Sequence, residues 1–247
     1  MIEPVIEAVN ISRVFGSGPT RVQALKDVNL TLTGGELTVL MGPSGSGKTT
    51  LLSILGCMLA PTAGTVRVCG ASAAGARPDE LAQIRRQHIG FVFQAYHLFP
   101  TLTVAENVRL ALDVRSEHGL KAIAKTEEVL ASVGLTSKLA SFPGQLSGGE
   151  QQRVAIARAI VAEPSAILAD EPTASLDAAN GQAIMAILST IAKERGRAVL
   201  VVSHDPRLFG FADKIVYIED GSLTREELTD SQVKPTRNKL IGALPTK

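Results

Sequence analysis

Residues 42–50 combine glycines, hydroxyl groups and one lysine in a spacing suited to binding phosphate. They read Gly42-Pro43-Ser44-Gly45-Ser46-Gly47-Lys48-Thr49-Thr50 and match the pattern G-x-x-x-x-G-K-[ST]. Glycines adopt backbone angles that other residues avoid, so consecutive amides can turn inward around an anion. We expect Lys48 to reach the β- and γ-phosphates of a nucleotide, and the Thr49 hydroxyl to hold Mg²⁺.

Two carboxylates, Asp170 and Glu171, directly follow the apolar run 167–169. A carboxylate at the end of a buried strand is unfavourable unless it meets a cation, so Asp170 is expected to bind Mg²⁺ through water or Thr49. Glu171 should point to the opposite side of the strand and act as general base for an attacking water. A solvated strand end would explain the isolated pair equally well, but the phosphate loop favours the catalytic interpretation.

A second anion site is predicted at Ser147-Gly148-Gly149, where free amides begin a helix. Gln94 and His204 each follow an apolar strand and are further candidates. Each also has an ordinary explanation, because a glutamine in a loop is usually solvated and a histidine at a strand end is usually structural.

Taken together, these motifs resemble the ATP-binding-cassette (ABC) family. The family's own signature, LSGGEQ, stands at residues 146–151, and the resemblance covers about residues 3–225. It implies an α/β fold with a phosphate-loop NTPase core of the ABC ATPase type, an N-terminal antiparallel β-subdomain and an inserted helical subdomain. It also implies hydrolysis of ATP, with ATP and Mg²⁺ as the bound groups.

The resemblance assigns roles to the remaining candidates. Gln94 would touch Mg²⁺ and transmit the nucleotide state to the helical part, and the His204 ring would contact the γ-phosphate and orient the water. Phe15 stands where the family places an aromatic residue that stacks on adenine; many members have Tyr there, and a core Phe is the alternative. Asp177, which follows Ser175-Leu176, would join the nucleotide-binding residues.

One chain therefore contains two phosphate-binding elements, and the resemblance explains why. In ABC proteins each ATP is held by the phosphate loop of one subunit and the signature of the other, in a head-to-tail dimer. A two-fold axis makes both sites equivalent in a homodimer. ATP binding would close this dimer, and hydrolysis would release it.

The strands that position these residues are predicted from apolar patterns. The run 198–202 is expected to be a central strand, flanked on its far side by 216–218. Residues 71–78 are small and glycine-rich, which predicts a surface loop. The other predicted strands are 5–9, 28–32, 37–41, 64–68, 89–93 and 167–170.

Helices are predicted at 49–55, at 103–114 with Thr103 as the cap, at 126–133 and at 145–162. A later helix carries Ile184, Ile187, Leu188 and Ile191 on one face. We expect one ABC ATP-binding domain over residues 3–228, with its helical subdomain at about 95–162. The polar tail, residues 229–247, is expected to be partly disordered.

Composition narrows the class of protein. The chain has 247 residues, of which 45% are hydrophobic and 20% charged, so it can bury a large core. No stretch approaches the roughly 18 apolar residues of a membrane span, and the N-terminus does not resemble a signal peptide. A cytoplasmic protein is therefore expected. The net charge of +1 argues against nucleic-acid binding. Cys57 and Cys69 are expected to be buried thiols.

A transporter subunit is favoured over a soluble ABC ATPase, because the chain shows neither a second phosphate loop nor coiled-coil heptads. Residues 84–94 and 168–173 resemble the bacterial subgroup that serves lipoprotein release, macrolide export and glycolipid export. Residues 98–104 also resemble amino-acid importers, which are the alternative. The predicted partners are an integral membrane permease, a second copy of this chain and, through the permease, a membrane-fusion adaptor. The subunit would lie peripherally on the inner face of the cell membrane.

Overall fold

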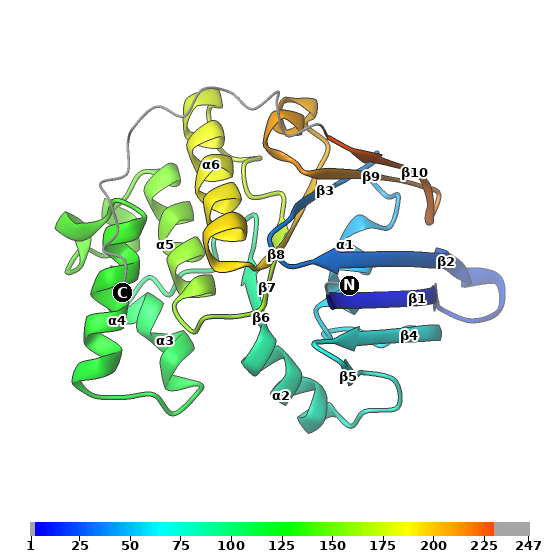
Figure 1. Cartoon of the computed structure of the whole chain (residues 1–247), viewed down its shortest axis with the longest axis horizontal. Helices are drawn as coiled ribbons and strands as arrows, with labels where there is room; N and C mark the ends of the chain where they lie inside the picture. Colours follow the sequence, from blue (N-terminus) through cyan, green and yellow to red (C-terminus); the bar gives the residue numbers. More distant parts are fainter. Residues whose placement is uncertain (1–2, 230–247) are drawn as a thin grey trace.

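The computed structural model describes residues 3–229, which form two β-sheets and the helices around them (Figure 1). In the larger sheet the strand order is β10-β9-β3-β8-β7-β6. All of these strands are parallel except β10, which pairs antiparallel with β9. Their bounds are β3 (Leu37–Met41), β6 (Ile89–Val92), β7 (Ala166–Asp170), β8 (Ala198–Ser203), β9 (Lys214–Glu219) and β10 (Ser222–Leu228).

The strand order corrects one sequence-based prediction. β9 pairs with β3, and β3 lies between β9 and β8, so residues 216–218 do not flank 198–202. Apolar patterns identify buried strands, but strand neighbours depend on the crossover connections between them. Because β3, β8, β7 and β6 are parallel neighbours, their carboxyl ends meet at one edge of the sheet.

The smaller sheet is antiparallel, with the order β2-β1-β4-β5. The prediction of a loop at 71–78 is wrong at both ends, because β5 occupies its first residues and a helix begins at Pro78. The strands are β1 (Pro4–Phe15), β2 (Val22–Thr33), β4 (Ala63–Val68) and β5 (Ala71–Ser72).

The helices largely follow the predicted pattern, although α2 was not predicted. The predicted helix at 145–162 begins only at Gly148, so both signature glycines lie in its first turn. The α-helices are α1 (Lys48–Leu55), α2 (Pro78–His88), α3 (Val104–Asp113), α4 (Leu120–Ser132), α5 (Gly148–Ile160) and α6 (Ala178–Arg195). The 3₁₀ turns are η1 (Gly18–Thr20), η2 (Thr136–Lys138), η3 (Pro143–Gln145) and η4 (Pro206–Phe211).

Helices cover both faces of the larger sheet. α1 packs on one face through Leu51 and Leu55, whereas α5 and α6 pack on the other through Ile156 and Ile184. Figure 1 shows α3 and α4, in green, beyond α5 and away from the smaller sheet. α3, α4 and α5 share a separate apolar core around Leu112. The helical part is therefore a packed unit of its own beside the strands.

The predicted cap of α3 is confirmed. The Thr103 hydroxyl accepts a hydrogen bond from the Glu106 amide at 3.2 Å, and the Glu106 carboxylate accepts one from the Thr103 amide at 2.8 Å. This reciprocal pair satisfies two groups that the first turn leaves unbonded. The hydrogen bonds of Thr103 also lower the pKa of the Glu106 carboxyl.

Two remaining predictions have different outcomes. Cys57 is buried as expected, but Cys69 is exposed, so the prediction of two buried thiols is wrong for Cys69. The predicted tail lies outside the described residues except for Thr229. Within residues 3–229, no helix combines the length and the apolar character needed to cross a membrane.

Candidate functional site

The phosphate loop connects β3 to α1 and surrounds its own lysine. Gly45 and Gly47 have left-handed φ angles of 81° and 101°. A Cβ atom on Gly47 would also lie 2.6 Å from the Ala24 carbonyl oxygen, so only glycine fits there. Lys48 is buried, and its Nζ donates to the carbonyl oxygens of Gly42 at 2.8 Å and Pro43 at 2.7 Å.

The unpaired groups of this loop fit a phosphate ligand. The Ser46 hydroxyl is buried and has no hydrogen-bond partner in the described chain. Within the same part of the chain, Lys48 forms no ion pair with a carboxylate. Buried polar groups normally find a partner. The unpartnered Ser46 hydroxyl, together with an ammonium group whose charge no carboxylate neutralises, is therefore suited to a triphosphate at this loop.

Thr49 and Asp170 meet where α1 faces the end of β7. The Thr49 hydroxyl lies 3.5 Å from the Asp170 carboxylate. Burial raises the pKa of Asp170 and the nearby Glu171 charge raises it further, while the Thr49 hydrogen bond and Lys48 lower it. A bound cation would favour the charged carboxylate, and Mg²⁺ prefers oxygen ligands of this kind. The two side chains therefore fit a magnesium ion.

Glu171 does not continue β7, contrary to the expectation that it lies on the opposite side of the strand. Its φ is 47°, which is left-handed, and its amide donates to the Val202 carbonyl oxygen at 3.0 Å. A left-handed non-glycine residue is strained by roughly 1–3 kcal/mol and persists only where its surroundings hold it. The chain turns at Glu171, and this turn sets the direction of the carboxylate.

The Glu171 carboxylate contacts the residues that end β8. Its Oε1 lies 2.8 Å from His204 Nδ1, and its Oε2 lies 3.5 Å from the Ser203 hydroxyl. The sequence identified Glu171 and His204 separately, but it gave no sign that they are hydrogen-bond partners. The structure thus brings the predicted base and the predicted histidine together at the edge that also carries the phosphate loop.

The signature residues begin α5, on a different side of the sheet from α1. Ser147 caps this helix by accepting from the Glu150 amide at 3.3 Å, and Glu150 accepts from the Ser147 amide at 2.7 Å. Figure 1 shows α5 and α1 separated by β7 and β8. Among the described residues, no hydrogen bond or ion pair joins Ser147 to the phosphate loop.

Asp177 caps α6 rather than contacting the phosphate loop. Its carboxylate accepts from the Asn180 amide at 2.8 Å and from the Asn180 side chain at 2.7 Å. A Cβ atom on Gly149 would lie 2.6 Å from Asn180 Oδ1. Asn180, which is hydrogen-bonded to Asp177, therefore lies close to Gly149, and Asp177 lies near the signature residues.

Gln94 is exposed in the loop after β6, and this loop has an unexpected anchor. Tyr96 and His97 are consecutive residues with left-handed φ angles of 58° and 48°. Arg158 of α5 donates to both of their carbonyl oxygens, at 2.7 Å and 2.5 Å. Sequence reasoning missed Arg158, because its helical spacing does not distinguish it from any other helix arginine.

Phe15 ends β1 with 39% of its surface exposed. The alternative that Phe15 is a core residue is therefore wrong. Its ring is available to a ligand, but the described residues alone do not place a base against it.

Residues 25–174 match a family model described as ABC transporter. This chain belongs to the ABC transporter family. The match spans the phosphate loop, the signature and the carboxylates after β7. The chain is therefore an ATP-binding cassette of the ABC ATPase type, as its motifs predicted.

Two groups of curated relatives are similar to this cassette. The macrolide export ATP-binding/permease protein MacB of Salmonella typhimurium is 45% identical over 219 residues, which are 89% of this chain and 34% of MacB. The chain thus spans about a third of that relative's length. The lipoprotein-releasing system ATP-binding protein LolD of Bordetella pertussis is 43% identical over 220 residues, covering 89% of this chain and 95% of LolD.

Solved structures show the same architecture. A dimeric post-hydrolysis state of the ATP-binding cassette MJ0796, bound to ADP and Pi, superposes with a TM-score of 0.83 at 41% identity. That comparison covers 90% of this chain and 98% of the other. A second dimeric structure of MJ0796, described as a bacterial ABC transporter cassette, gives a TM-score of 0.82 at 42% identity. The predicted fold class is confirmed.

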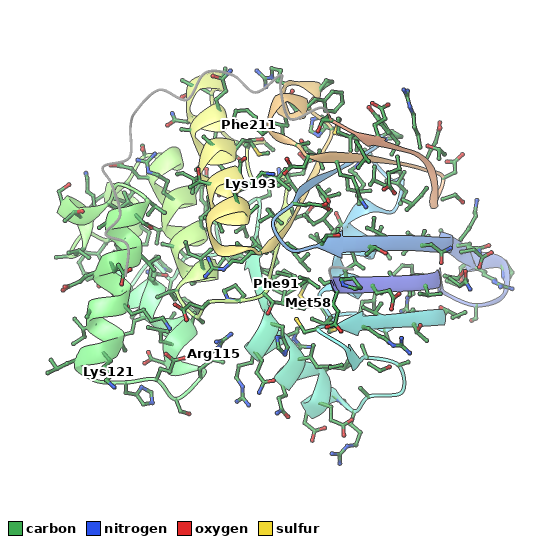
Figure 2. All side chains as sticks on the ribbon, in the orientation of Figure 1. Met58, Phe91, Arg115, Lys121, Lys193 and Phe211 are labelled. Atoms are coloured by element: carbon green, nitrogen blue, oxygen red, sulfur yellow. The ribbon has the colours of Figure 1, made fainter. Side chains whose placement is uncertain are left out.

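Replacing the loop lysine tests the phosphate site. Lys48→Ala removes charge-assisted hydrogen bonds to phosphate, so binding of a non-hydrolysable ATP analogue should weaken at least about tenfold. Calorimetry measures the affinity. Lys121→Ala is the matched control, because Lys121 is exposed on α4, far from the loop in Figure 2. Equal affinity in the Lys48 variant and in the control would contradict the assignment.

Proposed function

We propose that this cassette is the ATP-binding and ATP-hydrolysing subunit that powers a membrane exporter. The observation that carries the proposal is the meeting of Lys48, Thr49, Asp170, Glu171 and His204 at one sheet edge. This edge combines a phosphate loop, an oxygen pair suited to Mg²⁺ and a candidate base. The family match and the ADP bound to MJ0796 support ATP as the substrate.

The hydrolytic roles follow from the contacts. Lys48 and the loop amides would hold the phosphates, and Thr49 and Asp170 would hold Mg²⁺, with Gln94 nearby in the loop after β6. Bound Mg²⁺ neutralises charge on the phosphate oxygens. Glu171 would take a proton from the attacking water, whose oxygen bonds to the γ-phosphorus as the bond to the ADP oxygen breaks. His204 would orient the Glu171 carboxylate through their 2.8 Å contact.

A second copy of the chain would complete each site. Ser147 and the phosphate loop lie on elements that cover opposite faces of the sheet, so one ATP would need them from different subunits. The two dimeric MJ0796 structures support this arrangement. We infer a homodimer in which ATP lies between the phosphate loop of one subunit and Ser147, Gly148 and Gly149 of the other.

Export is favoured by the names of the relatives. MacB is described as a macrolide export protein and LolD as part of a lipoprotein-releasing system. We propose a separate integral membrane permease as partner, with the cassette bound peripherally at the inner face of the membrane. A membrane-fusion adaptor would join through the permease.

The permease would dock beside Gln94, in a hollow between the helical part and the sheet. The hollow has a volume of about 400 Å³ and is lined by Phe91, Phe93, Phe99 and Val114 together with Arg86, Arg115 and Arg158. No acidic residue lines it. Figure 2 labels two of these residues, Phe91 and Arg115. A permease segment that offers an apolar side chain and a carboxylate would complement this surface.

The aromatic and apolar residues of this loop differ in their surroundings. Leu98 packs against the core of the helical part, and the Tyr96 hydroxyl approaches Gly148. Phe99 is 55% exposed and lines the hollow. Phe99, rather than Tyr96 or Leu98, is therefore the better residue for testing the docking surface.

Glu171→Gln tests the catalytic base. The amide keeps the size of the side chain but cannot accept a proton, so ATP turnover should fall by about 10²–10⁴ while nucleotide binding persists. Phosphate release measures turnover, and size-exclusion chromatography should detect an ATP-bound dimer. Glu128→Gln is the control, because Glu128 is exposed on α4, away from this edge. Turnover in Glu171→Gln equal to that of the parent protein would refute the role.

Phe99→Asp tests the docking surface. It removes an exposed aromatic ring and adds a carboxylate that would compete with the permease for the arginines of the hollow. Copurification with the cognate permease should therefore be lost, while ATP binding and the melting temperature are retained. Leu120→Asp is the matched control, because Leu120 is 85% exposed on α4 and does not line the hollow. Normal copurification of the Phe99 variant would place the permease elsewhere.

A further inference from the structure

Phe15 is covered on one face by an arginine from its own strand. The Arg13 guanidinium carbon lies 4.6 Å from the centre of the Phe15 ring. A cation over an aromatic face is attracted to the ring's electron density. Phe15 is also 39% exposed, so part of the residue stays open to solvent although the arginine lies over the ring.

Arg13 is held in place by the segment that follows α1. Its Nη1 donates to the Ala60 carbonyl oxygen at 2.9 Å. The same segment fixes the neighbouring backbone, because the Val14 amide donates to the Thr62 hydroxyl at 3.0 Å and the Thr62 amide donates to the Ser12 carbonyl oxygen at 2.8 Å. Arg13 thus connects the ring of Phe15 to the chain that leaves the phosphate-loop helix.

The contacts of Arg13 point to the ring rather than to a carboxylate. Among residues 3–229, Arg13 forms no ion pair within 4.0 Å, and its Nε is buried without a hydrogen-bond partner. A buried donor that lacks a partner is unfavourable. The guanidinium group keeps its place over the ring despite this, held by the Ala60 carbonyl and by the ring face itself.

We propose that Arg13 is a positioning residue for the base of the bound nucleotide, acting through Phe15. The inference rests on the proposed stacking of adenine on Phe15. By backing one face of an exposed ring, Arg13 restricts its rotation before the base arrives, so less freedom is lost on binding. The base then stacks on the opposite face of the ring, since any nucleotide base has a π-face that can stack on an aromatic side chain.

This role differs from two simpler ones. If Arg13 acted as a positive charge near the phosphates, its loss would weaken the binding of every ligand that carries phosphate. If it only tied β1 to residues 60–62, its loss would lower stability without separating the base from the phosphates. A role through the ring predicts a loss confined to ligands that carry a base.

The experiment measures by calorimetry how tightly the full chain binds two ligands, a non-hydrolysable ATP analogue with Mg²⁺ and inorganic triphosphate with Mg²⁺. Where direct binding of a ligand is weak, its affinity is measured by competition. Arg13→Met should lower the affinity for the analogue by about three- to tenfold and leave the affinity for triphosphate unchanged. Arg225→Met is the control, because it removes a guanidinium group that lies 5.8 Å from the ring centre of Tyr217 on another sheet. Its affinity for both ligands should equal that of the parent protein.

A double-mutant cycle with Phe15→Leu assigns the effect to the ring. Phe15→Leu alone should lower the affinity for the analogue. Adding Arg13→Met to Phe15→Leu should lower this affinity no further. Thermal denaturation checks that each variant folds. If Arg13→Met does not fold, Arg13→Gln makes the same comparison, because it removes the cation over the ring and keeps an amide that can donate a hydrogen bond.

The outcomes separate this inference from the stacking proposal beneath it. An unchanged affinity in Phe15→Leu overturns the stacking role, and the inference falls with it. A loss in Phe15→Leu combined with parental affinity in the Arg13 variant overturns the inference alone. Equal losses for the analogue and for triphosphate, or additive losses in the double variant, overturn it as well.

Discussion

The parallel alignment of β3, β8, β7 and β6 is the constraint on which the candidate site depends. Parallel strands end at the same edge, so the residues that follow them meet although they are far apart in sequence. The phosphate loop follows β3, Glu171 follows β7 and His204 follows β8. Ligands of open α/β sheets bind outside the carboxyl ends of the strands, and the buried apolar strands make this edge rigid.

The same sheet also separates the two anion-binding elements. α1, which carries Lys48, packs on one face, and α5, which begins at Ser147, packs with α6 on the other. Asp177 and Asn180 sit beside the signature glycines and not beside the phosphate loop. The sheet that lies between the two elements is the physical reason why we propose that a second subunit completes each nucleotide site.

Local features were predictable from sequence, whereas relations between distant residues were not. The strand at 37–41 and the Thr103 cap depend on neighbouring residues, and both were predicted correctly. The position of β9 beside β3, the left-handed turn at Glu171 and its contact with His204 depend on the packing of separate elements. Arg158 is a further case, because its function comes from two carbonyl oxygens in a distant loop.

Disulfide cross-linking between two singly substituted chains tests the two-subunit site most directly. Cys69 is exposed and is first replaced by Ser, while Cys57 is buried and stays. One chain carries Ser44→Cys, the other carries Ser147→Cys with a tag of different size, and both carry Glu171→Gln to slow hydrolysis. The account predicts an ATP-dependent cross-link between the two chains. No such cross-link with ATP, together with a cross-link inside a single chain carrying both cysteines, would contradict it.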